Sequence, residues 1–117
     1  MTTIDDDAII INCVSLNQTN KMVTMGTDKG FLTVPYATFE KGCKRNDLLR
    51  YEGENFPYNC GVNSVSQLYD TALFALVTDG TNPRHPNTKV CIFNSASKLP
   101  VVSYTFCEEV KKVVYNQ

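Results

Sequence analysis

The sequence lacks the features that mark several common classes of protein. No apolar run approaches the roughly 18 residues of a membrane-spanning helix, and the longest, such as Ala8–Ile11 and Leu73–Val77, have the length of a strand. The acidic run Asp5–Asp7 stands where a secretory signal carries positive charge, so we expect no signal peptide. The formal net charge is −1, which gives no reason to expect nucleic-acid binding.

Motifs for catalysis and for metal binding are also missing. The five cysteines form no CxxC pair, and His85 is the single histidine, so no zinc signature appears. No glycine-rich phosphate loop and no serine elbow is present. Cys107 has no histidine near it in the sequence to activate a thiol. We therefore expect a protein that is not an enzyme and uses no cofactor, and the cysteines inside apolar runs favour a reduced, cytoplasmic chain.

What the sequence does contain is a series of short strands separated by turn residues. Its apolar fraction of 43% and charged fraction of 20% are those of an ordinary folded domain. Asp28–Gly30 predicts a tight turn, because glycine takes a positive φ at little cost. The continuously apolar run Leu73–Val77 predicts a strand buried on both faces. The expected strands are Ile11–Leu16, Met22–Thr27, Phe31–Val34, Gly61–Tyr69, Leu73–Val77, Lys89–Phe93, Pro100–Phe106 and a last one beginning at Val110–Tyr115.

These strands form two meanders of about 40 residues each, the length of one four-stranded propeller blade. We assign residues 1–35 to a first blade, 60–107 to a second and 108–117 to the start of a third. Residues 36–59 show little periodicity and are predicted to be a long connection, with one irregular strand around Asp47–Tyr51. The pattern is all-β, although periodicity alone does not separate a propeller from a sandwich.

The run Leu73–Asn94 resembles the second blade of the PROPPINs, the phosphoinositide-binding, WD-repeat-like propellers of autophagy. Similar motifs lie at Asn17-Gln18, Gly26-Thr27, Gly30-Phe31 and Glu109–Lys111, so the resemblance covers the chain except residues 36–59. It departs from the family in that Phe93-Asn94 replaces Trp-Asp and Asp70 stands where arginine is frequent. Within the run, the chain keeps Ala75-Leu76-Val77, Gly80, Asn82-Pro83, Pro86 and Lys89-Val90 at the family's spacing.

The resemblance implies a partial seven-bladed β-propeller, with about two four-stranded antiparallel blades and the first strand of a third. It also implies a parent that binds phosphatidylinositol 3-phosphate and the 3,5-bisphosphate at autophagosomal precursor, endosomal or vacuolar membranes. The parent would recruit autophagy proteins of the lipid-transfer or conjugation machinery. The family's headgroup sites lie on later blades and carry a Phe-Arg-Arg-Gly motif. That motif is absent here, so no residue of this chain is assigned to the headgroup.

The candidate partner-binding site is the loop between the two strands of that run. Two prolines limit the conformational entropy of the loop, and its cations make it locally positive. Its simpler interpretation is a rigid exposed turn that only joins two strands. For His85 alone, a solvated loop residue is favoured over a pH sensor. The residues assigned to partner binding are Asn82, Pro83, Arg84, His85 and Lys89.

Other charged or modifiable segments have simpler interpretations. The basic residues Lys41, Lys44 and Arg45 are offset by nearby acids and are expected in a solvated loop. Asn17–Thr19 matches a glycosylation sequon by chance if no secretory route exists. Two other functions stay open, a WD-type protein scaffold that binds no lipid and a small self-standing sandwich. A part-propeller exposes sheet edges, so we expect the remaining blades, a second copy or another protein to cover them.

Overall fold

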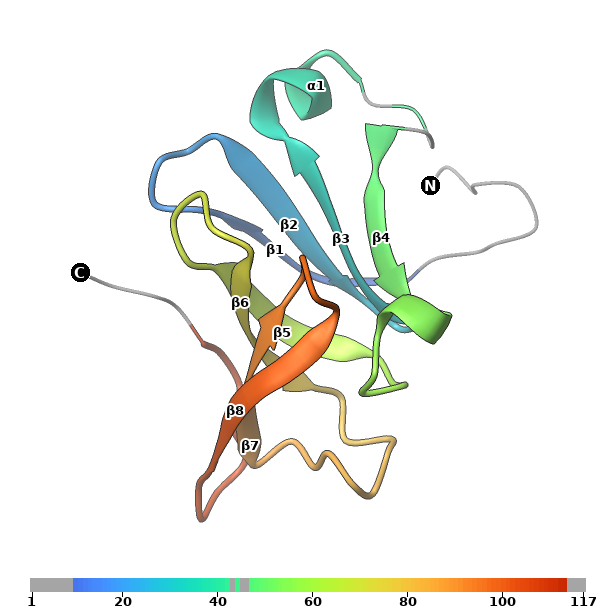
Figure 1. Cartoon of the computed structure of the whole chain (residues 1–117), viewed down its shortest axis with the longest axis vertical. Coiled ribbons are helices and arrows are strands. Elements are labelled where there is room, and N and C mark those ends of the chain that lie inside the picture. Colours follow the sequence, from blue (N-terminus) through green and yellow to red (C-terminus); the bar gives the residue numbers. More distant parts are fainter. Residues whose placement is uncertain (1–9, 43, 45–46, 114–117) are drawn as a thin grey trace.

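A computed structural model of the chain describes residues 10–42, 44 and 47–113, and it is built from two antiparallel sheets (Figure 1). Each sheet has four strands in sequential order, β1-β2-β3-β4 and β5-β6-β7-β8. These confirm the expected all-β class with two four-stranded units. The strands are β1 (Ile11–Leu16), β2 (Met22–Thr27), β3 (Gly30–Pro35), β4 (Leu49–Glu52), β5 (Val62–Gln67), β6 (Leu73–Thr78), β7 (Lys89–Asn94) and β8 (Leu99–Thr105).

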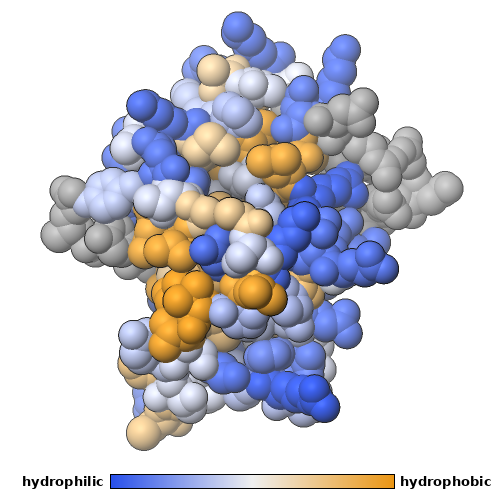
Figure 2. Space-filling model, viewed as in Figure 1, coloured by the Kyte–Doolittle hydropathy of each residue, from blue (hydrophilic) through white to orange (hydrophobic). Residues whose placement is uncertain are grey.

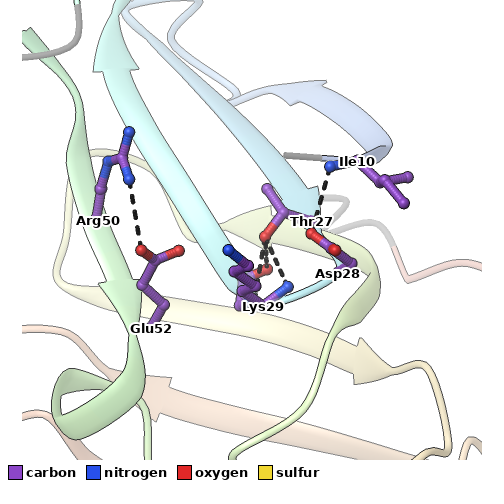
Figure 3. Close-up of polar contacts among 7 residues, drawn as sticks. Ile10, Thr27, Asp28, Lys29, Arg50 and Glu52 are labelled. Carbon is purple, nitrogen blue, oxygen red and sulfur yellow. Dashed lines mark hydrogen bonds and ion pairs between the residues drawn. The ribbon is translucent and has the colours of Figure 1, made fainter. Parts of the chain in front are cut away.

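The turn between β2 and β3 follows the sequence prediction. The Thr27 hydroxyl accepts hydrogen bonds from the amides of Lys29 and Gly30, both at 3.1 Å, and Figure 3 shows this contact at the end of β2. Gly30 has φ of 154°, and a Cβ added there would lie 2.0 Å from the Tyr51 carbonyl oxygen. Only glycine fits this position, because β3 and β4 approach each other at the turn.

The two sheets pack face to face around a cluster of aromatic rings. Phe31 of β3 is fully buried and lies at the centre of this cluster. Its ring centroid is 4.7 Å from Tyr51 in the first sheet and 4.9 Å from Phe74 in the second. Phe56 and Phe93 contact it edge-on at 5.8 Å each. The larger buried cluster therefore lies between the two sheets. The first sheet also has a smaller cluster of its own, made of Val23, Met25, Leu32 and Val34.

The backbones of the two sheets approach each other closely at β1, β2 and β5. Contacts between sheets are concentrated where β5 meets β1 and β2. Gly26 makes this approach possible, because an added Cβ would lie 2.6 Å from both the Cys13 Sγ and the Val62 carbonyl oxygen. The Asn12 side-chain amide donates to the same Val62 carbonyl at 3.1 Å, and the Ser15 hydroxyl donates to the Val65 carbonyl at 2.7 Å.

A polar clasp, formed by Asn17–Thr19 and Tyr69-Asp70, joins the two sheets at one end. Asn17 is 3% exposed, and its side-chain amide donates to the Tyr69 carbonyl and to the Asp70 carboxylate, both at 2.8 Å. The Thr19 hydroxyl donates to the same carboxylate, and the Gln18 side chain accepts from the Tyr69 amide. These hydrogen bonds hold the pKa of Asp70 below its usual value. Asn17 is thus committed to the sheet interface, where a glycan would not fit.

The segment 36–59 is more structured than the long connection that its sequence predicts. It contains the five-residue helix α1 (Tyr36–Glu40), the 3₁₀ turn η2 (Gly53–Asn55) and strand β4, which pairs with β3. The first sheet therefore continues beyond residue 35 and takes its fourth strand from this segment. Four residues of β4 are too few to show alternation, so only an irregular strand was predictable there.

The C-terminal part differs from the expected start of a third blade. Residues 108–113 form no strand, and the rest of Val110–Tyr115 lies outside the described residues. Instead, the backbone near Val113 bonds to the Ser64 hydroxyl of β5, whose oxygen accepts from the Val113 amide at 3.0 Å. No helix in the described part of the chain is long and apolar enough to cross a membrane.

The second sheet leaves its outer strand uncovered. Every residue of β8 is exposed, and Figure 2 shows apolar side chains gathered over this part of the molecule. On the first sheet, Val14 and Leu16 of β1 are also about half exposed. Apolar side chains are therefore exposed on both sheets, and what covers them stays a prediction of the sequence. The large apolar side chains exposed on and just after β8 are Leu99, Val101, Val102, Tyr104 and Phe106.

Candidate functional site

The predicted docking loop connects β6 to β7, and Asn82 organises its first half. The Asn82 side-chain oxygen accepts from the Arg84 amide at 3.1 Å, and its backbone carbonyl accepts from the His85 amide at 2.9 Å. The Asn82 side-chain amide donates to the Tyr58 carbonyl at 2.8 Å, which ties the loop to the segment before β5. An asparagine suits this place because its short side chain bonds the backbone two residues ahead.

The second half of the loop is held by His85 and Lys89. The His85 carbonyl accepts from the Thr78 hydroxyl at 2.5 Å, at the end of β6. The Lys89 ammonium donates to the Arg84 carbonyl at 3.2 Å and lies 3.5 Å from the His85 Nδ1. Partial burial lowers the pKa of His85, and the nearby positive charges of Lys89 and Arg84 lower it further. His85 is therefore neutral at neutral pH, and it accepts rather than donates toward Lys89.

The structure divides the five predicted residues into two groups. Asn82, His85 and Lys89 are half-buried and shape the loop by hydrogen bonds, whereas Pro83 and Arg84 are exposed. Arg84 is thus the more exposed of the two cations of the loop. Lys89 contributes charge as well, but its ammonium also holds the backbone of the loop in place.

A small cavity of about 250 Å³ lies between this loop and β8, and it was not predicted from the sequence. Tyr58, His85 and Lys89 line one side of it and Pro100–Ser103 the other. The Tyr58 ring packs edge-on against the His85 ring, with centroids 4.8 Å apart. Tyr58 lies in the non-periodic segment 36–59, so nothing in the sequence placed it beside a loop 24 residues later.

A second polar region surrounds the β2–β3 turn and strand β4 (Figure 3). There the Asp28 carboxylate accepts from the Ile10 amide at 3.3 Å, and Arg50 pairs with Glu52 at 3.5 Å. Asp28 and Glu52 border a cavity of about 500 Å³ together with Cys60. Within the described residues, no group of three or more His, Cys, Asp or Glu side chains is placed to hold a metal ion.

The cysteines and the basic cluster show no arrangement for chemistry in the described residues. Burial raises the pKa of the Cys60 thiol to about 11 and also raises that of Cys91, so both stay protonated at neutral pH. Cys107 is exposed. The Lys44 amide donates to the Asp47 carboxylate at 2.7 Å in a local turn, and Arg45 lies outside the described residues.

The chain was compared with known proteins by sequence and by structure. No family model matches it. SVP1-like protein 2 of Pichia angusta is 32% identical over 62 residues, which cover 53% of this chain and 17% of that protein.

Several solved structures share the arrangement of the two sheets. Hsv2 of Kluyveromyces marxianus matches with a TM-score of 0.63 and 18% sequence identity. The matched part is 88% of this chain and 27% of the Hsv2 chain. Hsv2 of Kluyveromyces lactis matches with a TM-score of 0.60 and 15% identity, over 84% of this chain and 25% of the Hsv2 chain. The propeller domain of Cps50 (Swd1) from Myceliophthora thermophila matches with a TM-score of 0.58 and 14% identity, over 90% of this chain and 28% of the Cps50 chain.

These similarities decide between the two all-β architectures that the sequence leaves open. Each sheet corresponds to a blade, and the array of two is not closed. The chain spans about a quarter of the length of the solved propellers that it matches. It therefore has the fold of part of a PROPPIN-like β-propeller.

Proposed function

We propose that the chain supplies the partner-docking blades of a PROPPIN, which recruits autophagy proteins to phosphoinositide membranes. The order and spacing of the motifs from Ala75 to Val90 support membership of this family, as does the 32% identity to SVP1-like protein 2. The headgroup of phosphatidylinositol 3-phosphate or the 3,5-bisphosphate would bind on blades that this chain does not include. The protein would then be cytoplasmic and peripheral on autophagosomal precursor, endosomal or vacuolar membranes.

The observation that carries the docking role is the build of the β6–β7 loop. Two prolines and the hydrogen bonds of Asn82 and Lys89 hold the loop in one shape, so little conformational entropy remains to be lost on binding. Arg84 projects from this frame into solvent. A fixed loop that presents an unburied cation favours a partner with a negatively charged surface, of the lipid-transfer or conjugation machinery by family resemblance.

The test separates partner recruitment from lipid binding. Arg84→Glu in the natural full-length protein should reduce partner recovery in quantitative affinity purification, while binding to vesicles containing phosphatidylinositol 3-phosphate stays unchanged. Lys98→Glu is the matched control, because Lys98 is exposed at the opposite end of β7 and the change in net charge is the same. Loss of vesicle binding by Arg84→Glu at equal stability would contradict the proposal, and so would equal partner recovery by both variants.

A second candidate function is a WD-type interaction scaffold that binds no lipid. The propeller of Cps50 (Swd1) favours it, because its TM-score of 0.58 over 90% of this chain is close to the values for Hsv2. Vesicle binding distinguishes the two candidates. A natural full-length protein that floats with phosphatidylinositol 3-phosphate vesicles and not with phosphatidylcholine vesicles supports the PROPPIN, and one that floats with neither supports the scaffold.

A further inference from the structure

A cavity of about 410 Å³ lies between the first strands of the two sheets. Within the described part of the chain, β1 and β5 each pair with a strand on one side only, and the segment 111–113 borders the cavity on a third side. The volume is within the range of small-molecule sites, about 300–1,000 Å³. The cavity shares no residue with the β6–β7 loop. It is lined by Cys13–Leu16, Gln18, Asn63–Ser66 and Lys111–Val113.

The segment that carries Lys111 and Lys112 is held at both ends by backbone hydrogen bonds. The Val110 amide donates to the Asn87 carbonyl at 2.8 Å, and the Val113 amide donates to the Ser64 hydroxyl of β5 at 3.0 Å. The backbone between these two bonds is therefore fixed beside β5 before a ligand arrives. A wall that is already ordered loses little conformational entropy when a ligand binds to it.

The charge on the wall of this cavity is positive. Lys111 and Lys112 both line it, and no described aspartate or glutamate does. Both lysines are exposed, and neither forms an ion pair with a described carboxylate. Glu108 and Glu109 precede them in the sequence but lie outside the lining. The cavity therefore attracts an anion, and its partial enclosure limits the screening of that attraction by salt.

The rest of the wall combines hydrogen-bond donors with apolar side chains. The Asn17 amide donates to the Met22 carbonyl of β2, so the alternation along β1 directs the Leu16 N–H toward the free edge of the strand. Asn63 is exposed and adds a side-chain amide. The side chains of Val14 and Leu16 are about half exposed beside these donors. A mostly apolar wall with a few polar groups is typical of sites for small molecules.

We propose that this cavity binds a small phosphorylated molecule, with its phosphate oxygens at Lys111 and Lys112. A phosphate monoester carries a charge of about −1.5 to −2 at pH 7, which two ammonium groups balance. Lysine binds phosphate as a point charge, and the donors of Leu16 and Asn63 are available to the remaining oxygens. The site uses no residue of the docking loop and lies on the first two blades. It is therefore independent of the proposed docking function and of the headgroup sites expected on later blades.

Titration calorimetry of the natural full-length protein with inorganic triphosphate tests the two lysines. Lys111→Gln combined with Lys112→Gln should weaken one triphosphate site about tenfold, while the backbone hydrogen bonds at either end of the segment remain. Lys41→Gln combined with Lys98→Gln is the matched control, because both lysines are exposed, lie outside the cavity and change the net charge by the same amount. Equal triphosphate affinity of the two double variants would overturn the proposal.

A second pair of variants tests the location of the site. Val14→Glu adds a carboxylate to the wall and should weaken triphosphate binding about tenfold by repulsion. Val101→Glu makes the same change on β8, where the side chain is 56% exposed against 59% for Val14, and should leave triphosphate binding unchanged. Triphosphate binding that Val14→Glu leaves unaltered would overturn the placement of the anion in this cavity.

Flotation of the same variants with vesicles containing phosphatidylinositol 3-phosphate identifies the source of the phosphate. Vesicle binding that Val14→Glu leaves unchanged, together with weaker triphosphate binding, supports a soluble phosphorylated molecule. Loss of vesicle binding in parallel with triphosphate binding supports a lipid headgroup at the same lysines. The Arg84→Glu experiment decides the docking function separately, because it measures partner recovery.

Discussion

Removing the ring of Phe31 should uncouple the two blades. Phe31 is fully buried. Its ring contacts Tyr51 in the first sheet, Phe74 and Phe93 in the second, and Phe56 in the segment between them. Replacing a buried phenylalanine by alanine costs about 3–5 kcal/mol, because apolar burial is lost and a cavity is left behind. The loss of contacts between aromatic rings adds to this cost. We expect Phe31→Ala to cost about 4 kcal/mol of local stability.

Hydrogen exchange of the amides of β2 and β6 gives the free energy of local opening and so measures this loss. The measurement does not require two-state unfolding of the whole protein. Phe31→Leu keeps most of the volume and should cost about 1.5 kcal/mol. Phe39→Ala is the matched control, since Phe39 is 40% exposed on α1 and should cost less than about 0.5 kcal/mol. Opening free energies of Phe31→Ala and Phe39→Ala within about 1 kcal/mol of each other would refute the reasoning, because the shared aromatic core would then not hold the sheets together.

Two further predictions concern the polar clasp and the docking loop. Asn17→Ala removes the hydrogen bonds to Tyr69 and Asp70. It should lower the opening free energy of the β1–β2 hairpin by about 2–3 kcal/mol, and unchanged hydrogen exchange of the hairpin amides would contradict this prediction. The lowered pKa of His85 means that the fold favours its neutral form, so stabilisation of the loop is fully present above the ordinary value of 6.5 and is lost as the pH falls below it. Exchange of the 82–89 amides, corrected for its intrinsic rate, should therefore be faster at pH 5.5 than at pH 7.5, and the difference should vanish in His85→Gln.

The strands were predictable where each carried enough alternating or apolar residues to reveal its period. β1 and β2 have the predicted bounds, and β6 extends the prediction Leu73–Val77 by one residue. Phe74 to Val77 are all buried, as a continuously apolar strand predicts. The pattern that predicts each of these strands lies within the strand itself, so the sequence was sufficient to predict them.

The remaining features depend on contacts that distant residues make. Strand β4 forms because β3 offers it an edge, and α1 follows Pro35 in a segment with no helical period. The loop was predicted as one cationic surface, but Lys89 turns out to bond the loop's own backbone. Tyr58 reaches the site through tertiary packing alone. Local patterns carry no information about such pairings, so the cavity beside β8 needed the structure.

The hydrogen bonds that cross between the sheets have a consequence for synthesis on the ribosome. Asn12, Ser15 and Asn17 each bond to a residue that is 50 to 52 positions later in the chain. At translation rates of about 5–20 residues per second, the first hairpin emerges roughly 3–10 s before its partners. During that interval the apolar face of the hairpin has no partner, so the nascent chain is most prone to aggregation in this window.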